Sequence, residues 1–264
     1  MPKPISICVC VKSVVLAAPE NIRGGIVPRD LQNSVVNPFD KPALRMGLDL
    51  VRECGGSLTA LSMGPEPARQ TLLYALALGA DRAALLSDPA LAGSDTLATS
   101  AALAAAVKAL GPFDLVLFGT RSADSDTGQV AAQTAELLDV PFVSFVLEAG
   151  TSEGKLVVRR TLDGYSETYR LGLPAALSVH PRALPAGDPT LSSIETTYAS
   201  ASVESLTAAD LGLSRERMGE TGSPTRVLSM TRTSPERKCE FLAGTAEKQA
   251  QELISRLVSR GLLE

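Results

Sequence analysis

The sequence predicts an α/β protein with a mostly parallel, doubly wound sheet, an antiparallel addition and an extended C-terminal arm. Three observations lead to this prediction. Short apolar runs alternate with segments of helical periodicity as far as about residue 140, which is typical of βαβ crossovers. Strand-like runs joined by Gly-containing turns then follow up to residue 179. Residues 181–235 are rich in proline, serine, threonine and glycine and have little periodicity.

Four short, largely apolar runs in the first half of the chain predict strands, and the last of them is expected to be buried on both faces. They are Ile5–Val11, Leu58–Met63, Arg82–Leu86 and Leu115–Phe118. Helices are predicted between them. Asn37-Pro38 is typical of a helix start, with Asn37 as the capping side chain, and this helix is expected to end at Gly55-Gly56. Residues 68–78 are expected to form a helix closed by Gly79, and Ser94-Asp95 to cap a helix that runs to Leu110. Residues 12–36 are irregular, with a tight turn expected at Arg23–Ile26 inside a small hairpin.

The second half is predicted to begin with antiparallel strands. These are Phe142–Val146, Lys155–Thr161, Tyr165–Leu171 and Ala175–Val179, with turns at Glu153-Gly154 and Asp163-Gly164. The arm follows, and helical spacing returns from Thr245 to Arg260. Leu191 and Ile194 are two apolar residues in the otherwise polar arm, and they either fold back onto the body or anchor a partner.

Composition narrows the function classes. Among 264 residues, 45% are hydrophobic and 20% charged, as in an ordinary globular protein. The net charge of −4 without a basic cluster gives no support for nucleic-acid binding, and the absence of tryptophan argues against base-stacking platforms. The lone His180 excludes a multi-histidine metal site. Because the four cysteines form no CxxC pair, we expect buried, reduced thiols, as in a cytoplasmic protein. No apolar run approaches the length of a membrane span, so we expect no membrane insertion.

The stretch Asp114–Val130, DLVLFGTRSADSDTGQV, carries the strongest functional signal. A buried strand ends at Gly119, a small polar loop follows, and Asp126 with Gln129 forms a capping-box pattern that opens a helix. This layout sets free backbone amides and a positive dipole end in front of a ligand, which favours a nucleotide. Neither G-x-G-x-x-G nor a P-loop is present. Ligands of open parallel sheets bind where the strand order reverses, so the loops after Val11, Met63 and Phe118 are expected to meet there.

Other interpretations of this stretch stay open from the residues alone. It could be an ordinary strand-to-helix crossover. The protein could be a standalone adenine-nucleotide sensor of the universal-stress type, although such a sensor has no use for a long arm after Pro181. It could also be a nucleotide hydrolase in which Asp124 or Asp126 is catalytic, which would require a pocket that raises a carboxyl pKa.

A set of short motifs spans nearly the whole chain in a fixed order. They are Cys8–Lys12, Asn37–Asp40, Met63–Pro65, Ala77–Arg82, Asp95–Ser100, Gly119–Val130, Leu173–Ala175 and Gly222–Thr225. Together they resemble the β subunit of electron transfer flavoproteins, the family that includes the FixA proteins. The Ala-hydrophobic-Gly-Ala-Asp-Arg run and the Asp-x-Asp-Thr-x-Gln loop are its most specific parts.

The resemblance implies a fold related to adenine-nucleotide hydrolases and a heterodimer with an α subunit that carries FAD. It implies an electron carrier subunit that serves an acyl-CoA dehydrogenase or a similar flavoenzyme and has no side-chain catalytic residue. Residues 1–180 would be the nucleotide-binding domain, and residues 181–264 an arm and helix that pack on the α subunit. The implied nucleotide-binding residues are Cys10, Asn37, Pro38, Phe39, Asp40, Met63, Gly119, Thr120, Arg121, Ser122, Ala123, Asp124, Ser125, Asp126, Thr127, Gly128, Gln129 and Val130.

Two branches of the family differ in the nucleotide that the β subunit holds. One branch holds a structural AMP, and the electron-bifurcating branch holds a second FAD whose adenosine end takes the AMP place. Asp40-Lys41, residues 93–100 and 222–225 and the long C-terminal helix favour FAD. Ser13-Val14-Val15 departs from the glutamine-valine-proline pattern of the bifurcating members. The arm also lacks the usual proline-arginine-tyrosine, although Leu191 and Ile194 occupy the partner-docking positions.

Overall fold

A computed structural model of the chain describes residues 3–15, 34–184, 187–226, 228 and 239–263. The chain forms two compact units, residues 1–228 and residues 229–264. The turn predicted at Arg23–Ile26 lies outside the described residues.

Unit 1 is organised around a large sheet with β1 (Ile5–Cys10) near its middle. On one side of β1 lie β4 (Gly56–Met63), β5 (Arg82–Leu86) and β11 (Glu204–Leu206). On the other side lie β6 (Leu115–Gly119), β10 (Ala175–Val179), β7 (Phe142–Ser152), β8 (Lys155–Leu162) and β9 (Tyr165–Leu171). All pairs from β11 to β7 are parallel, whereas β8 and β9 are antiparallel to their neighbours. A separate antiparallel pair joins β2 (Ser13–Val15) to β3 (Ser34–Val36).

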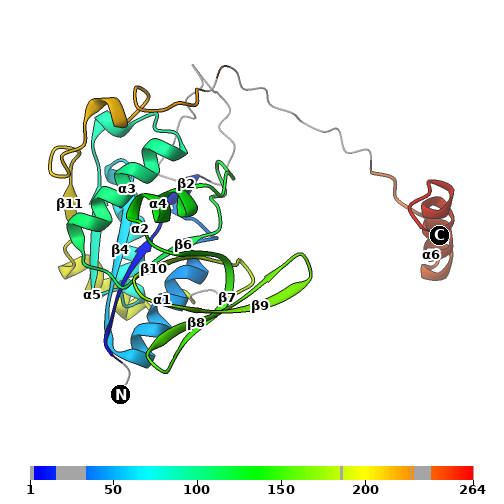
Figure 1. Cartoon of the computed structure of the whole chain (residues 1–264). Helices are drawn as coiled ribbons and strands as arrows, with labels where there is room; N and C mark the ends of the chain where they lie inside the picture. Colours follow the sequence, from blue (N-terminus) through cyan, green and yellow to red (C-terminus); the bar gives the residue numbers. More distant parts are fainter. Residues whose placement is uncertain (1–2, 16–33, 185–186, 227, 229–238, 264) are drawn as a thin grey trace. The chain divides into compact units, whose positions relative to one another are not determined.

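Helices cover both faces of the parallel part, which confirms the predicted doubly wound α/β class (Figure 1). One face packs against α1 (Lys41–Cys54) and α2 (Arg69–Leu78). The opposite face packs against α3 (Thr96–Leu110) and α4 (Val130–Leu138). Successive residues of β1 serve the two faces in turn: Val9 belongs to the first cluster, and Cys8 and Cys10 belong to the second.

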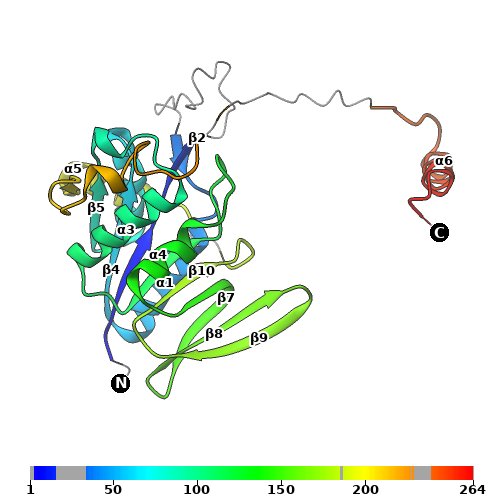
Figure 2. The same cartoon turned by 45° about the horizontal axis from the view of Figure 1, so that its top comes forward.

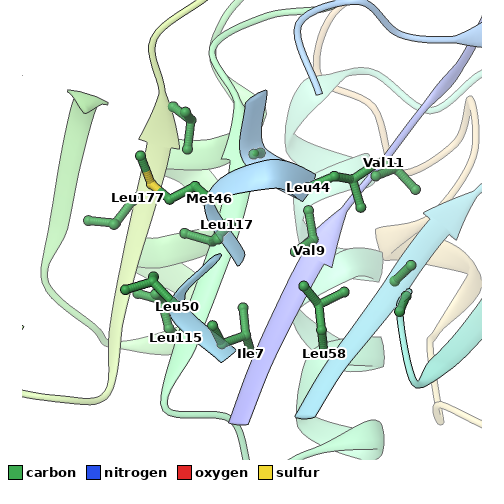
Figure 3. Close-up of a cluster of buried hydrophobic side chains, with 14 of the residues drawn as sticks. Ile7, Val9, Val11, Leu44, Met46, Leu50, Leu58, Leu115, Leu117 and Leu177 are labelled. Atoms are coloured by element: carbon green, nitrogen blue, oxygen red, sulfur yellow. The ribbon is translucent and has the colours of Figure 1, made fainter. Parts of the chain in front are cut away.

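Helix α1 lies close against the sheet. Leu44, Met46 and Leu50 point from the helix into the cluster of strand side chains (Figure 3). A Cβ atom on Gly47 would lie only 2.7 Å from Cδ1 of Leu58, so the missing side chain lets the helix approach the strands. The position of α1 places the turn before it at the edge of the sheet where β1 and β6 end.

The strands after residue 140 confirm the predicted hairpin turns, but one strand differs from the prediction. Glu153-Gly154 and Asp163-Gly164 connect β7, β8 and β9, which extend away from the helices as a twisted ribbon (Figure 2). Strand β10 was expected in the antiparallel addition. It lies instead between β6 and β7 and runs parallel to both. Its uniformly buried sequence, Ala175–Val179, is typical of such an internal strand.

The described part of the arm is more ordered than its composition predicts. Helix α5 (Leu191–Ser200) begins at Thr190, whose hydroxyl accepts a hydrogen bond from the Ser193 amide, and it packs against α2. Strand β11 then joins β5 at the edge of the sheet, and the Arg69 side chain donates to the Val203 carbonyl and the Ser205 hydroxyl. The described arm residues therefore include regular elements that lie on unit 1. Unit 1 extends past residue 180, and packing of the arm on a partner stays a prediction.

The described residues of unit 2 contain α6 (Ala246–Ser259), which the sequence predicts. The Thr245 side chain caps it by accepting a hydrogen bond from the Lys248 amide. Cys239 also belongs to this unit and is exposed, which corrects the expectation that all the thiols are buried; Cys8, Cys10 and Cys54 are buried and free.

Candidate functional site

The strand order reverses between β1 and β6. From β1 the chain adds β4 and β5 in one direction, and it then returns to place β6 on the other side of β1. The segments that leave the carboxyl ends of these two strands, Val11–Lys12 and Gly119–Gln129, lie where open parallel sheets bind ligands. We name the place between these two segments the crevice. The turn Asn37–Asp40 before α1 is hydrogen-bonded to both segments. The structure thus brings together the loops after Val11 and Phe118, as the sequence predicts.

Asn37 links the α1 turn to the loop after β6. It was expected to cap α1, but the helix begins at Lys41 with Asp40 at the cap position and Pro42 in the first turn. The Asn37 side chain is 1% exposed. Its amide group donates to Asp40 Oδ1 (2.9 Å) and to the Arg121 carbonyl (2.8 Å), and its oxygen accepts from the Ala123 amide (3.2 Å). Asn37 therefore fixes the backbone of the loop instead of a helix end.

Asp40 is a buried carboxyl at the base of the crevice. Its Oδ2 accepts a hydrogen bond from the Lys12 amide (2.7 Å). Burial raises the pKa of the carboxyl from 3.8 to about 7, although hydrogen bonds from Lys12, Asn37 and the Gly119 amide and the charge of Lys12 all lower it. Gly119 packs directly against this turn, since a Cβ atom there would lie 2.2 Å from Asp40 Oδ1 and 2.6 Å from the Phe39 carbonyl oxygen. The base of the crevice has no room for a side chain at residue 119.

Lys12 is a site residue that the sequence analysis missed. Its ammonium nitrogen lies 2.7 Å from Asp124 Oδ1 and 3.3 Å from the hydroxyl oxygens of Ser122 and Ser125. The side chains of Lys12 and Asp124 are 31% and 15% exposed, so the ion pair is partly shielded from water. The available signal was the position of Lys12 immediately after a buried strand that ends at the crevice.

The other end of the loop is held by Arg121. Its guanidinium lies 4.6 Å from the centre of the Phe39 ring and 3.0 Å from Asp126 Oδ1. Asp126 was expected to cap α4, and this prediction is wrong: Asp126 has a left-handed backbone (φ +52°), and α4 begins at Val130 after Gln129 without any side-chain cap. Gly128 also has positive φ (+64°). In the described part of the chain, the amides of Gly128 and Gln129 have no hydrogen-bond acceptor.

Buried hydroxyl groups without partners lie at the same edge of the sheet. Thr120, 7% exposed, begins the loop, and Ser13, 5% exposed, follows Lys12. Their hydroxyl oxygens, and that of Ser62 near the end of β4, have no hydrogen-bond partner among the described residues. A buried hydroxyl group without a partner is unfavourable, so these groups indicate that a bound molecule or water completes the site.

The remaining predicted residues lie in the α1 turn, in the loop, at the start of α4 and at the ends of β1 and β4. Pro38 is exposed in the α1 turn, Thr127 is exposed in the loop, and Val130 is the first residue of α4. Cys10 ends β1, where a hydrogen bond with Cys8, burial and the nearby Asp40 charge raise the pKa of its thiol. Met63 ends β4, the strand beside β1, and packs against the α3–α4 cluster.

The predicted docking residues lie on a different element. Leu191 is 81% exposed and Ile194 is half-buried on α5, the helix that contacts α2. The segment before α5 reaches towards the crevice, since Asp188 pairs with Lys41 at the start of α1 (3.4 Å).

The described residues contain neither a metal-binding cluster nor a membrane-spanning helix. No cluster of three or more His, Cys, Asp or Glu side chains there is suited to hold a metal ion. None of the helices in those residues is long and apolar enough to cross a membrane.

Comparison with known proteins gives consistent matches. A family model described as "Electron transfer flavoprotein domain" matches residues 25–211. An electron transfer flavoprotein subunit beta of Thermoanaerobacterium thermosaccharolyticum is 37% identical, over 87% of this chain and 88% of that protein. The caffeyl-CoA reductase-Etf complex subunit CarD of Acetobacterium woodii is 34% identical, over 97% and 99% of the two chains. The acryloyl-CoA reductase electron transfer subunit gamma of Anaerotignum propionicum is 31% identical, over 97% and 99%.

Proposed function

We propose a specific role for this chain within the electron transfer flavoprotein β-subunit (FixA) family, to which it belongs: it binds FAD at the β1–β6 crevice and passes electrons in a heterodimer with an α subunit. The adenosine and phosphate end of the FAD would lie against the loop Gly119–Val130. The observation that carries the proposal is that the amides of Gly128 and Gln129 and the hydroxyl of Thr120 have no hydrogen-bond partner in the part of the chain that the structure describes.

The groups on the loop are suited to the phosphate end of a nucleotide. Backbone amides at a helix N-terminus and hydroxyl groups are the donors that phosphate oxygens accept. A glycine at residue 128 leaves its own amide open to close approach. The buried hydroxyl of Thr120 would gain the partner that it lacks among the described residues. The site therefore fits an adenine nucleotide, with these groups holding the phosphate end and the Asn37–Asp40 turn holding the loop.

Electron transfer needs no catalytic side chain, because the flavin itself accepts and donates electrons while the protein supplies binding and orientation. The residues of the crevice are suited to that task. Asn37, Lys12 and Arg121 each make several contacts that set the shape of the loop. AMP in the same place, with FAD held only by the α subunit, is the alternative ligand, since both share the adenosine and phosphate groups.

The names of two relatives suggest the class of partner. One belongs to a caffeyl-CoA reductase-Etf complex and one to an acryloyl-CoA reductase, and this chain aligns with each over 97% of its length. We therefore propose an acyl-CoA dehydrogenase or reductase as one redox partner, docked through the exposed Leu191 and neighbouring Ile194 on α5. Electron bifurcation is part of the proposal only if the β site holds FAD.

The test is a count of the nucleotides released from the purified heterodimer. Two FAD per heterodimer would support the proposal, one FAD and one AMP would support the alternative, and no adenine nucleotide beyond the α subunit's FAD would refute both. Gly128→Ala places a Cβ atom 3.3 Å from the Thr120 carbonyl oxygen at positive φ, and it should lower the nucleotide content of the β subunit. Gly154→Ala is the matched control, because Gly154 has a similar φ (+74°) in the β7–β8 turn and open space around it.

A further inference from the structure

The loop proposed to hold a phosphate carries two carboxylates. Asp124 and Asp126 would each repel an anion that approaches the amides of Gly128 and Gln129, and Asp40 adds a third carboxyl at the base of the crevice. In a protein of net charge −4, no general excess of positive charge offsets them. An anion site on this loop therefore needs local compensation for Asp124 and Asp126.

Among the described residues, Arg121 and Lys12 supply such compensation, and they differ in how closely they are held. Arg121 pairs with Asp126 where both side chains are half-exposed, at 47% and 60%, so water and salt weaken their interaction. Lys12 pairs with Asp124 at 2.7 Å in a more shielded place. The Lys12 ammonium also reaches the Ser122 and Ser125 hydroxyls, and Ser125 in turn donates to Asp124 (3.1 Å). The Asp124 charge is thus held by a cluster of donors that converges on Lys12.

We propose that Lys12 is a positioning residue that makes the crevice selective for a phosphate-bearing nucleotide over the bare nucleoside, by neutralising Asp124 and holding it against Ser122 and Ser125. This inference rests on the proposed function, because it concerns the same ligand. Lys12 acts through Asp124 and needs no contact with the phosphate. The buried hydroxyl of Thr120 at the start of the loop, which has no partner among the described residues, is the independent sign of a ligand there.

The test compares the binding of AMP and adenosine to the full-length chain by calorimetric titration. Lys12→Met removes the charge and keeps most of the side-chain length. Without the Lys12 charge, Asp124 repels a nearby phosphate more strongly, which should weaken AMP binding by about ten- to thirtyfold and leave adenosine binding unchanged. Lys12→Arg should retain the preference for AMP. Lys108→Met is the matched control, since Lys108 is an exposed lysine that contacts the Leu137 carbonyl at the far end of α4.

The double variant Lys12→Met with Asp124→Asn separates compensation from direct contact. If Lys12 acts through Asp124, removing both charges should restore AMP binding to within about threefold of the wild type. Failure of this rescue would overturn the inference, as would an equal loss of AMP and adenosine binding in Lys12→Met, which would indicate only a disordered loop. Unchanged AMP binding in Lys12→Met would overturn it too. If the wild-type chain binds neither molecule, the proposed function falls, and the role of Lys12 falls with it.

Discussion

Asp40 should make the stability of the protein depend on pH in a direction opposite to most carboxylates. Burial raises its folded-state pKa to about 7, above the value of 3.8 for a solvated carboxyl. The stabilisation from the protonated folded form is therefore fully present below about pH 4, and it is lost as the pH rises through 7. A shift of this size corresponds to about 4 kcal/mol of unfolding free energy between the two limits.

The perturbation is Asp40→Asn, which removes the titration and keeps the size of the side chain. One carboxyl oxygen becomes an amide group, which faces a donor, either the Lys12 amide or the Asn37 side chain. This mismatch should cost about 1–3 kcal/mol at every pH. At pH 4 the variant should therefore be less stable than the wild type, and by pH 8 it should be equally or more stable, because the wild type then buries a charge.

The assay is urea denaturation of the full chain at pH values from 4 to 8.5. Asp49→Asn is the control, since Asp49 is a half-exposed aspartate on the same helix that pairs with Arg45 and Arg52. The difference in unfolding free energy between wild type and Asp40→Asn should change steadily up to about pH 7 and level off above it, whereas Asp49→Asn should differ from the wild type by a small, constant amount. A constant difference for Asp40→Asn as well would refute the reasoning, because it would mean that Asp40 stays ionised throughout.

Three further substitutions test the packing around the site, with urea denaturation as the measurement. Gly119→Ala should destabilise the protein by about 1–3 kcal/mol, since its Cβ atom would overlap Asp40 and the Phe39 carbonyl. Gly150→Ala in β7 is the control and should have little effect, so equal effects of the two substitutions would contradict the close packing at residue 119. Ser223→Ala should cost about 1–3 kcal/mol because it removes a buried hydroxyl that accepts from the half-buried Asp95 amide and donates to the Gly219 carbonyl, and a neutral result would mean that water replaces the hydroxyl. Leu117→Ala should cost about 2–5 kcal/mol, because Leu117 is fully buried beneath α1, and a loss below 1 kcal/mol would mean that the core collapses around the gap.

The predicted elements that agree with the structure are those in which a local signal and burial act together. Arg82–Leu86 is a strand with the predicted bounds, and Asp95 caps α3 by accepting from the Ala98 amide, as its place before an alanine-rich run predicts. Strand order is a different matter. The mostly apolar run Ala175–Val179 is equally compatible with an edge next to β9 and with its actual place between β6 and β7, because only the packing of the whole sheet chooses between them.

The arm and the site show two further limits of prediction from sequence. Helix α5 and strand β11 are short and polar, and they are stabilised by contacts with α2 and β5 that no local pattern reveals. Asn37 and Asp126 both have side chains typical of helix caps, yet Asn37 bonds to residues 121 and 123, and Asp126 pairs with Arg121. Lys12 was missed for the same reason: its partners lie more than 100 residues away in the sequence, so only the fold brings them within reach.

The contacts of the carboxylates also bear on whether the crevice carries out hydrolysis. A general base needs an oxygen directed at the reacting water. Both oxygens of Asp40 accept hydrogen bonds from the protein, Asp124 is held by Lys12 and Ser125, and Asp126 pairs with Arg121. Asp40 has a pKa that would suit acid–base chemistry, but its oxygens are occupied by Lys12 and Asn37. Each carboxylate of the crevice thus serves to hold a neighbouring segment in place, which favours a site that positions a nucleotide over one that hydrolyses it.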